Sequence, residues 1–369
     1  MSAPHLGSSA VKAAMAKIKL EPSNVDEVIM GCVLQAGIGQ APTRQVALGA
    51  GLPIKTPTTT VNKVCASGMK AIMFGALTLS AGKANVVIAG GMESMSNVPF
   101  YMKRGETSYG GVTLEDGILK DGLSDAYQPI HMGNCGENTA KKLSISREEQ
   151  DNYAIESYER TRKSAEQGLL KKEITPVEIK GKKGSVVVDD DEEYKRFDAN
   201  KFRTLRTVFD ANNGTITAGN ASKINDGAAA CILTTEKVAN NLGLKPLAEI
   251  IDFADSAVEP IDFPISPVFA MKTLFERNNL KKDEVDLYEI NEAFSVVPLA
   301  NIKLLNLDAS KVNVFGGAVS CGHPIGMSGA RIVTRLVLHL QPGQLGMASI
   351  CNGGGGASAV LLRKVWNKI

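Results

Sequence analysis

The sequence lacks the features of several large protein classes. Its 369 residues include only six cysteines and no C-x-x-C pair, which argues against a disulfide scaffold and a zinc ribbon. The 41 Lys and Arg residues nearly balance 39 Asp and Glu residues, and a net charge of +2 gives no global field for nucleic acid or an anionic membrane. No apolar run approaches the roughly 20 residues that cross a bilayer. We therefore expect a soluble protein with free thiols and neither nucleic-acid nor membrane partners.

The beginning of the sequence also lacks targeting features. Residues 1–20 contain neither the charged and apolar regions of a signal peptide nor the Arg-rich, acid-poor pattern of a mitochondrial presequence. Aromatic residues are scarce, at 5%, but 44% of the chain is apolar, which is enough for a sizeable core. The length predicts two or three structural units.

A weak internal repeat is the clearest sign of organisation. Asp26 and Asp286 each precede a strand-like apolar run, and a Ser-Gly pair follows 41 residues after the first and 42 after the second. Both segments then reach a Gly-rich strand end. Strand candidates are residues 58–64, 85–89, 285–290 and 347–351, alternating with helical patterns. The pattern predicts two similar α/β halves with mixed or parallel sheets covered by helices.

The segment between the two halves differs from both of them in composition and periodicity. Residues 97–222 contain charge runs and weak periodicity, with one strong helix predicted after the capping box Ser146-x-x-Glu149. A basic cluster at Lys195, Arg196, Lys201, Arg203 and Arg206 follows an acidic run. A solvated patch is the usual interpretation, but such a cluster also suits the phosphates of a nucleotide-bearing ligand such as coenzyme A. We interpret this segment as an inserted loop domain.

Four residues are candidates for catalysis. Cys65 follows a β-branched run and precedes a helical pattern, and a helix N-terminus favours a thiolate. Cys351 ends an apolar strand before four glycines, His323 lies in a second glycine-rich loop, and Asn291 closes a strand. Taken singly, each has an ordinary explanation: a buried apolar thiol, a tight turn, a solvated or capping histidine, a helix N-cap. Their joint position at strand ends and loops of two repeated halves predicts one metal-free pocket.

At these residues the sequence resembles the thiolases, and within them the acetoacetyl-CoA thiolases (acetyl-CoA C-acetyltransferases). The resemblance spans nearly the whole chain. Its motifs are NKVCASGMK at 62–70, GGMESMS at 90–96, HMG at 131–133, NAS at 220–222, NEAF at 291–294, GHP at 322–324 and CNGGG at 351–355.

The resemblance implies a role for each site residue. Cys65 would be the nucleophile and Cys351 the acid and base, while His323 would activate Cys65 and share an oxyanion hole with a water held by Asn291. The N–H groups of Cys65 and Gly353 would form a second oxyanion hole. The residues implied to contact coenzyme A or the thioester are His131, Met132, Tyr158, Arg196, Phe197, Asp198, Lys201, Ser222 and Phe294.

The resemblance further implies a cation. Residues 259–264 are similar to those of the potassium-activated mitochondrial branch, in which backbone oxygens matching Ala218, Gly219, Ala221 and Val319 hold the ion. No other tightly bound cofactor is implied. Coenzyme A enters as a substrate, and the family forms homodimers and homotetramers.

The implied fold has two βαβαβαββ halves with mixed five-stranded sheets. We expect one half from residues 1–96 and 223–245, a CoA-binding loop domain from 97–222, and the second half from 246–369. Thiolases begin with a strand and an Arg-Thr-Pro segment, whereas residues 1–8 here lead straight into a helix. An interior strand of the first half is therefore expected to be missing.

Two other functions and two compartments stay open at this point. The shortened first half would suit a catalytically silent CoA-binding or oligomer-partner paralogue. A ketoacyl synthase also uses a cysteine nucleophile, but that branch usually has no counterpart of Cys351. The resemblance favours the mitochondrial matrix, and the absence of a visible presequence leaves the cytoplasm as the alternative.

Overall fold

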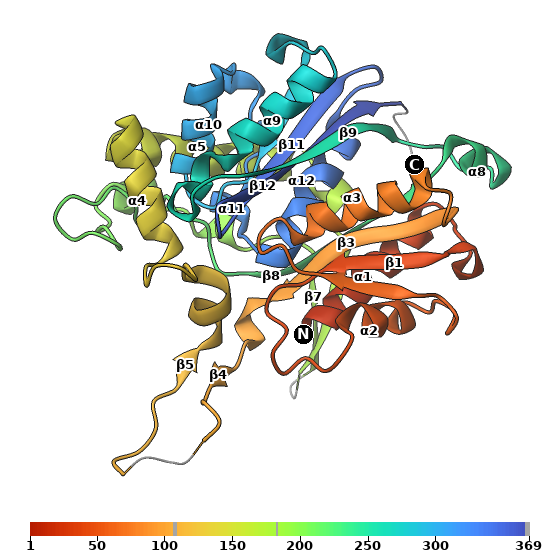
Figure 1. The fold of residues 1–369 in the computed structure, drawn as a ribbon, viewed down its shortest axis with the longest axis horizontal. Coiled ribbons are helices and arrows are strands. Elements are labelled where there is room, and N and C mark those ends of the chain that lie inside the picture. Colours follow the sequence, from red (N-terminus) through yellow and green to blue (C-terminus); the bar gives the residue numbers. More distant parts are fainter. Residues whose placement is uncertain (106–108, 182–183, 366–369) are drawn as a thin grey trace.

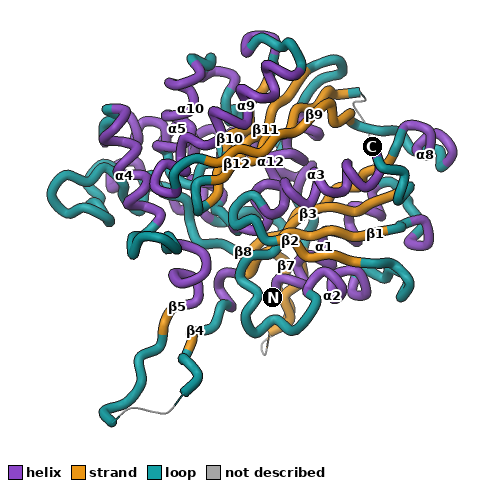
Figure 2. Tube along the Cα trace, viewed as in Figure 1, coloured by secondary structure: helices purple, strands orange, loops and turns teal. Residues whose placement is uncertain are grey.

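The computed structural model describes residues 1–105, 109–181 and 184–365. Two sheets, each covered by helices, lie one above the other, with α3 between them (Figure 1). The strand–helix alternation along each half is visible in Figure 2. The two repeated halves predicted from the sequence are therefore confirmed.

The first half builds a sheet of order β2-β1-β3-β8. Strands β1, β2 and β3 run parallel, and β8 is antiparallel to β3. Its elements are α1 (Ala3–Lys17), β1 (Glu27–Gly31), α2 (Pro42–Gly49), β2 (Thr58–Val61), α3 (Ser67–Ser80), β3 (Val86–Ser94), β8 (Asp226–Thr234) and α8 (Glu236–Asn241). Helix α1 packs on β3 and β8 from the outer face and buries Val11 and Met15 there.

The second half builds a sheet of order β10-β11-β12-β9, in which β12 is antiparallel to both of its neighbours. Its elements are β9 (Ala248–Ala257), α9 (Ser266–Arg277), β10 (Leu287–Ile290), α10 (Val296–Leu305), α11 (Ala318–Cys321), α12 (Ile325–His339), β11 (Leu345–Asn352) and β12 (Gly356–Lys364). Helix α9 covers the outer face of this sheet.

The two aspartates that revealed the repeat have the same structural role. The Asp26 carboxylate accepts hydrogen bonds from the N–H groups of Asn85 and Val86 at the start of β3. The Asp286 carboxylate accepts one from the N–H of Leu345 at the start of β11. Each aspartate thus ties the beginning of one parallel strand to its neighbour, and β1 and β3 correspond to β10 and β11.

Two expectations about the strands were wrong. Each sheet has four strands rather than five among the described residues. In the second half, the place equivalent to β2 is reduced to a single bridge between Tyr288 and Val312. The first half lacks a counterpart of β9. Because β9 lies at the edge of its sheet, the strand missing from the first half is an edge strand and not an interior one. All nine residues of β8 are accordingly only partly buried, whereas its counterpart β12 is almost wholly buried.

The Ser-Gly pairs lie where the halves meet. Helices α3 and α12 pack against each other between the sheets, and a Cβ on Gly68 would lie 2.9 Å from both the Ala330 nitrogen and the Gly326 oxygen. A Cβ on Gly329 would lie 2.7 Å from the nitrogen of Met69. Both glycines therefore allow the close approach of the two backbones. Ser67 opens α3 as expected, but α12 begins three residues before Ser328.

The segment between β3 and β8 carries a projecting arm, the long helix α5 and several shorter helices (Figure 1). Its elements are β4 (Phe100–Tyr101), β5 (Glu115–Asp116), α4 (Met132–Leu143), α5 (Arg147–Glu166), α6 (Leu170–Glu173), the hairpin β6 (Val177–Gly181) and β7 (Gly184–Val188), and α7 (Ala199–Phe202). The predicted capping box is confirmed, because Ser146 and Glu149 bond reciprocally at the start of α5. The pairing of β8 with β3 is consistent with the three-part division expected above, which stays a prediction.

Candidate active site

Cys65 lies on a strained turn between β2 and α3. The preceding residue, Val64, has φ +47°, a left-handed conformation that β-branched residues rarely adopt. Two side chains hold it there: Asn62 Oδ1 accepts from the Val64 N–H at 3.0 Å, and the Ser67 hydroxyl donates to the Val64 carbonyl at 2.6 Å. Strain of this kind persists only where the surroundings enforce it, and it clusters at functional sites.

Two backbone N–H groups favour the charged form of the Cys65 sulfur, that of Gly353 and its own. Burial raises the pKa of Cys65 to about 12, and these two N–H groups lower it only in part. The backbone N–H groups favour the thiolate, as expected at a helix N-terminus, but desolvation of the charged sulfur outweighs them. Cys65 rests as a thiol in this structure.

Cys351 lies close enough to Cys65 for the charges of the two sulfurs to interact. It is fully buried near the end of β11, and burial followed by repulsion from Cys65 holds its pKa well above the ordinary value. The repulsion means that the two sulfurs are electrostatically coupled, so that one thiolate disfavours the other. A pair of this kind passes a proton more readily than it carries two negative charges.

His323 and Asn291 form a second, directly bonded pair. Asn291 Nδ2 lies 3.4 Å from His323 Nε2, and His323 Nδ1 lies 2.6 Å from the Ser328 hydroxyl. Ser328 donates to the carbonyl of Pro324, so we assign the Nδ1 proton to His323 and leave Nε2 as an acceptor. Burial, and then the charge of Arg331, lower the pKa of His323 to about 3. The imidazole therefore rests neutral.

The residues expected along the thioester flank Cys351 and Gly353. Met132 sulfur lies 3.2 Å from the position of a Cβ on Gly353. His131 caps α4 by accepting from the Gly133 N–H at 2.9 Å, and its ring stacks on Phe209 at 4.6 Å. Phe209 in turn meets Phe294 edge-on at 6.2 Å. Phe209 and Phe294 pack in the same apolar cluster as Met132 and Cys351.

The residues expected around coenzyme A form a separate cluster. The ring of Tyr158, on α5, stacks on Phe197 at 4.8 Å, and its hydroxyl donates to Glu193 at 2.9 Å. Arg196 and Lys201 are exposed, and Asp198 caps α7. The structure thus separates the predicted set into a buried catalytic part and a largely exposed cationic part.

The four backbone positions expected to bind potassium already have a cationic neighbour. Lys223 Nζ donates to the carbonyl oxygens of Ala218 at 2.6 Å and Ala221 at 2.9 Å. Gly219 lies between them, and the buried Val319 packs in one cluster with Tyr158. Burial lowers the pKa of Lys223 to about 8, and the charge of Glu193 partly offsets this. Two unit charges about 4 Å apart repel by roughly 4 kcal/mol near a protein surface. Potassium at the same oxygens does not fit the residues present.

Sequence reasoning missed the function of Glu292, which it named only as part of the NEAF motif. This carboxylate is buried and accepts four hydrogen bonds, from Tyr153, Ser157, Asn313 and the N–H of Val319. It therefore ties the loop carrying Asn291 to the loop that leads to His323. The signal available in the sequence was an acidic residue directly after an apolar strand, beside an already suspected Asn.

Comparison with known proteins decides the family. The family described as "Thiolase, N-terminal domain" matches residues 1–237, and "Thiolase, C-terminal domain" matches residues 244–364. The chain belongs to the thiolase family. This membership agrees with the resemblance found in the sequence and with the paired α/β halves.

Several thiolases similar to this chain are known. Acetyl-CoA acetyltransferase B, mitochondrial, of Xenopus laevis is 60% identical over 366 residues, covering 99% of this chain and 87% of the relative. The mitochondrial acetyl-CoA acetyltransferase of Mus musculus is 59% identical over 364 residues, covering 98% and 86%. The crystal structure of Acat5 thiolase from Ascaris suum in complex with coenzyme A has a TM-score of 0.96 and 47% identity, covering 99% of this chain and 94% of that one.

Two further observations concern the described part of this thiolase. None of its helices combines the length and apolar character needed to span a membrane. Within residues 1–105, 109–181 and 184–365, no group of three or more His, Cys, Asp or Glu side chains is arranged to hold a metal ion.

Proposed function

We propose that this thiolase is an acetyl-CoA C-acetyltransferase that interconverts acetoacetyl-CoA plus CoA with two molecules of acetyl-CoA through an acetyl group on Cys65. A 2-methylacetoacetyl-CoA substrate is included in the proposal. The observation that carries it is the pairing of Cys65, on its strained turn with two N–H donors, with the coupled thiol of Cys351. Full-length similarity to proteins named acetyl-CoA acetyltransferase supports the substrate.

In the first half-reaction, Cys65 attacks the 3-keto carbon of acetoacetyl-CoA while its proton moves to His323 Nε2. Because both groups rest neutral, the thiolate and the imidazolium form together rather than in advance. The imidazolium then donates from Nε2 to the developing oxyanion, beside Asn291. Asn291 Oδ1 is buried without a hydrogen-bond partner among the described residues, which suits an acceptor for the predicted water.

Cleavage of the bond between carbons 2 and 3 leaves an acetyl thioester on Cys65 and an acetyl-CoA carbanion. Cys351 gives its proton to that carbanion and then, as thiolate, removes the thiol proton of incoming CoA. The CoA thiolate attacks the acetyl thioester, whose oxyanion the N–H groups of Cys65 and Gly353 stabilise. Departure of the Cys65 thiolate gives the second acetyl-CoA, and the His323 imidazolium returns its Nε2 proton to that thiolate, which restores both neutral groups. The reverse sequence is Claisen condensation.

The exposed cationic part of the site is proposed to bind coenzyme A. Tyr158 and Phe197 line a surface hollow together with Arg162, Lys195 and Glu159, so that stacked rings lie beside two cations and one carboxylate. Arginine and lysine bind phosphates by charge, and aromatic faces accept a planar base. The N–H of Ser222 bonds to the Ala293 carbonyl, which holds this proposed CoA-binding residue beside the loop that carries Asn291.

Assembly and location complete the proposal. We propose a homodimer or homotetramer, supported by the projecting arm around β4 and β5, on which large apolar side chains are exposed: Phe100, Met102, Tyr109, Val112 and Leu114. We place the protein in the mitochondrion, as the names of its relatives indicate. The CoA-binding segment is residues 97–222, between the two parts of the first half.

A covalent adduct tests the proposed function. Brief exposure to acetyl-CoA or acetoacetyl-CoA, followed by peptide mass spectrometry, is expected to show one acetyl group on Cys65. Cys65→Ser is expected to lose both the labile thioester and the formation of acetyl-CoA from acetoacetyl-CoA and CoA. Cys231→Ser is the matched control, because this cysteine lies on β8 outside the proposed site, and it is expected to retain both.

Three results are distinguishable. An acetyl group on Cys65 with turnover supports the enzyme. CoA binding with neither adduct nor turnover would favour the silent paralogue over the proposed function. An adduct on another cysteine, with unchanged turnover in Cys65→Ser, would overturn the assignment of the nucleophile.

A further inference from the structure

The turn from Thr217 to Lys223 encloses an internal positive charge. Lys223 Nζ uses two of its three donors on the carbonyl oxygens of Ala218 and Ala221. Its charge lies 3.9 Å from Glu193 Oε1 and 5.8 Å from the centre of the Tyr158 ring. A carboxylate and an aromatic face both stabilise a cation. The lysine side chain is 25% exposed and that of Glu193 15% exposed, so water screens this contact only in part.

These partners are those that a monovalent metal ion would use. Two of the four backbone positions expected to hold potassium are the two hydrogen-bond acceptors of Lys223. An ion bound to the same oxygens would have to displace the ammonium, because like charges at one site disfavour each other. The sequence signal is a lysine that is the only basic residue between positions 218 and 232.

The enclosed charge is connected to both catalytic loops through the backbone of the same turn. The carbonyl of Lys223 accepts from the His323 N–H at 2.9 Å, and the N–H of Ser222 donates to the Ala293 carbonyl at 3.1 Å. The carbonyl of Asn220 accepts from the Ser295 N–H at 2.8 Å. Whatever fixes this turn therefore also fixes the loops that carry His323 and Asn291.

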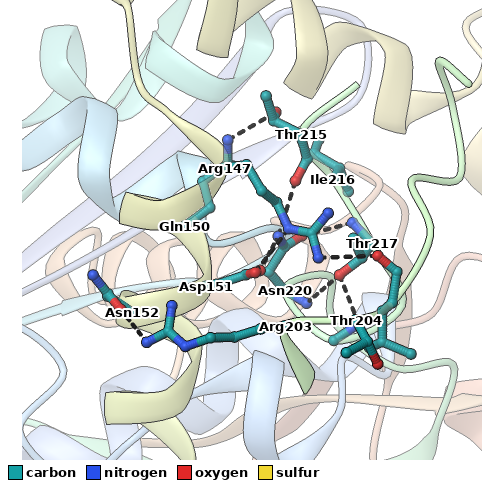
Figure 3. Close-up of polar contacts among 12 residues, drawn as sticks. Arg147, Gln150, Asp151, Asn152, Arg203, Thr204, Thr215, Ile216, Thr217 and Asn220 are labelled. Carbon is teal, nitrogen blue, oxygen red and sulfur yellow. Dashed lines mark hydrogen bonds and ion pairs between the residues drawn. The ribbon is translucent and has the colours of Figure 1, made fainter. Parts of the chain in front are cut away.

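The other side of the turn is fastened to α5, as Figure 3 shows. Asn220 Nδ2 donates to Asp151 at 2.9 Å, and Arg147 donates to the same carboxylate at 2.8 Å. The Asn220 side-chain oxygen accepts from the Thr217 N–H at 2.9 Å. The turn is thus held by polar contacts on one side and by the ammonium of Lys223 on the other.

We infer that Lys223 supplies from within the chain the positive charge that potassium supplies in the related branch, and that this protein does not depend on potassium. Lys223 is a positioning residue: it acts on the reaction through the backbone that it shares with His323. Only the kinetic tests of this inference rest on the proposed acetyl transfer; the tests of melting temperature and ion binding do not.

Three variants distinguish the effect of the Lys223 charge from the effect of the space that its side chain fills. Lys223→Ser removes the charge and leaves room for an ion, whereas Lys223→Met removes the charge but fills the space. Lys237→Ser, on the exposed face of α8, is the matched control for loss of a lysine. For each protein, kcat, KM for CoA and the melting temperature are measured in potassium chloride and in choline chloride at equal ionic strength. Crystals soaked in rubidium chloride report ion binding by anomalous diffraction.

The wild type and Lys237→Ser are expected to behave identically in the two salts. In choline, Lys223→Ser is expected to lose on the order of tenfold to a hundredfold in kcat/KM through misplacement of His323, and to melt lower. Potassium is expected to restore both properties in Lys223→Ser but not in Lys223→Met. Rubidium is expected beside Ala218 and Ala221 in the serine variant alone.

Several outcomes would overturn the inference: a potassium-dependent rate or melting temperature in the wild type, rubidium bound to the wild type, or Lys223→Ser that matches the wild type in choline. If no protein forms acetyl-CoA in any salt, the proposed function fails. The melting temperatures and the diffraction then still decide whether Lys223 takes the place of the ion.

Discussion

Replacing Glu292 by glutamine tests whether its carboxylate holds the catalytic loops together. Oε1 accepts from the Tyr153 hydroxyl at 2.9 Å and from Asn313 Nδ2 at 3.1 Å, while Oε2 accepts from the Ser157 hydroxyl at 2.8 Å and from the Val319 N–H at 3.0 Å. Glutamine keeps one oxygen and turns the other into an NH2 donor. In either orientation of the amide, its NH2 group therefore faces one hydroxyl and one N–H group that both donated to the carboxylate.

The expected loss follows from these contacts. A hydroxyl can rotate to accept from the new NH2, but the N–H of Asn313 or Val319 cannot. One buried donor is left unpaired, at about 1–3 kcal/mol, and the remaining bonds lose the added strength of a charged acceptor, roughly 1 kcal/mol each. Removal of a buried charge partly offsets these losses. We expect a net loss of about 3 kcal/mol in the free energy of unfolding.

Equilibrium unfolding in urea measures this loss for Glu292→Gln beside the wild type. Glu276→Gln removes the same charge from the exposed face of α9, so we expect it to stay within about 0.5 kcal/mol of the wild type. The kcat of Glu292→Gln is expected to fall as well, because Val319 leads directly to His323. A stability loss in Glu292→Gln no larger than in Glu276→Gln would refute the reasoning.

The remaining predictions concern acid and assembly. Burial alone would raise the pKa of Glu173, but the charge of Arg335 and hydrogen bonds from His339 and Arg335 hold it at about 2, below its ordinary 4.5. Its stabilisation of about 3 kcal/mol is therefore complete above pH 4.5 and is lost as the pH falls toward 2. Urea unfolding over this range should show a weaker acid dependence for Glu173→Gln, and an unchanged dependence would contradict the assignment. Sedimentation velocity should detect a dimer or tetramer that replacing Phe100 and Met102 by serine weakens; a monomeric wild type would count against that assembly.

Local patterns were sufficient for much of the fold. The helix after Ser146 began where its capping box placed it, because that signal lies within four residues of chain. The repeat could be recognised in the sequence because each half has an aspartate that bonds to a neighbouring strand and a glycine that allows α3 and α12 to approach closely. Strand edges were less accurate: β3 extends to Ser94, five residues beyond the expected end, because its pairing with β8 depends on a strand more than a hundred residues later.

The protonation states of the site were beyond local reasoning. The position of Cys65 before a helix correctly marked a strand-to-helix junction with N–H groups that lower its pKa, but it gave no sign of the larger, opposite effect of burial. Burial decides the net direction, and Cys65 is packed against Val33, Leu34 and Met95 of its own half and Ile325 of the other half. The neutral state of His323 has the same origin.

The sequence by itself determined which groups this protein can use: two thiols, an imidazole and an amide at the ends of repeated strands, and the thiolase motifs around them. Only the tertiary structure decided how they are charged and held. The Lys223 ammonium reaches Ala218 and Ala221 because the turn folds back on itself, and the carboxylate of Glu292 reaches a loop more than twenty residues away. Such contacts depend on distances in space, which spacing along the chain does not specify.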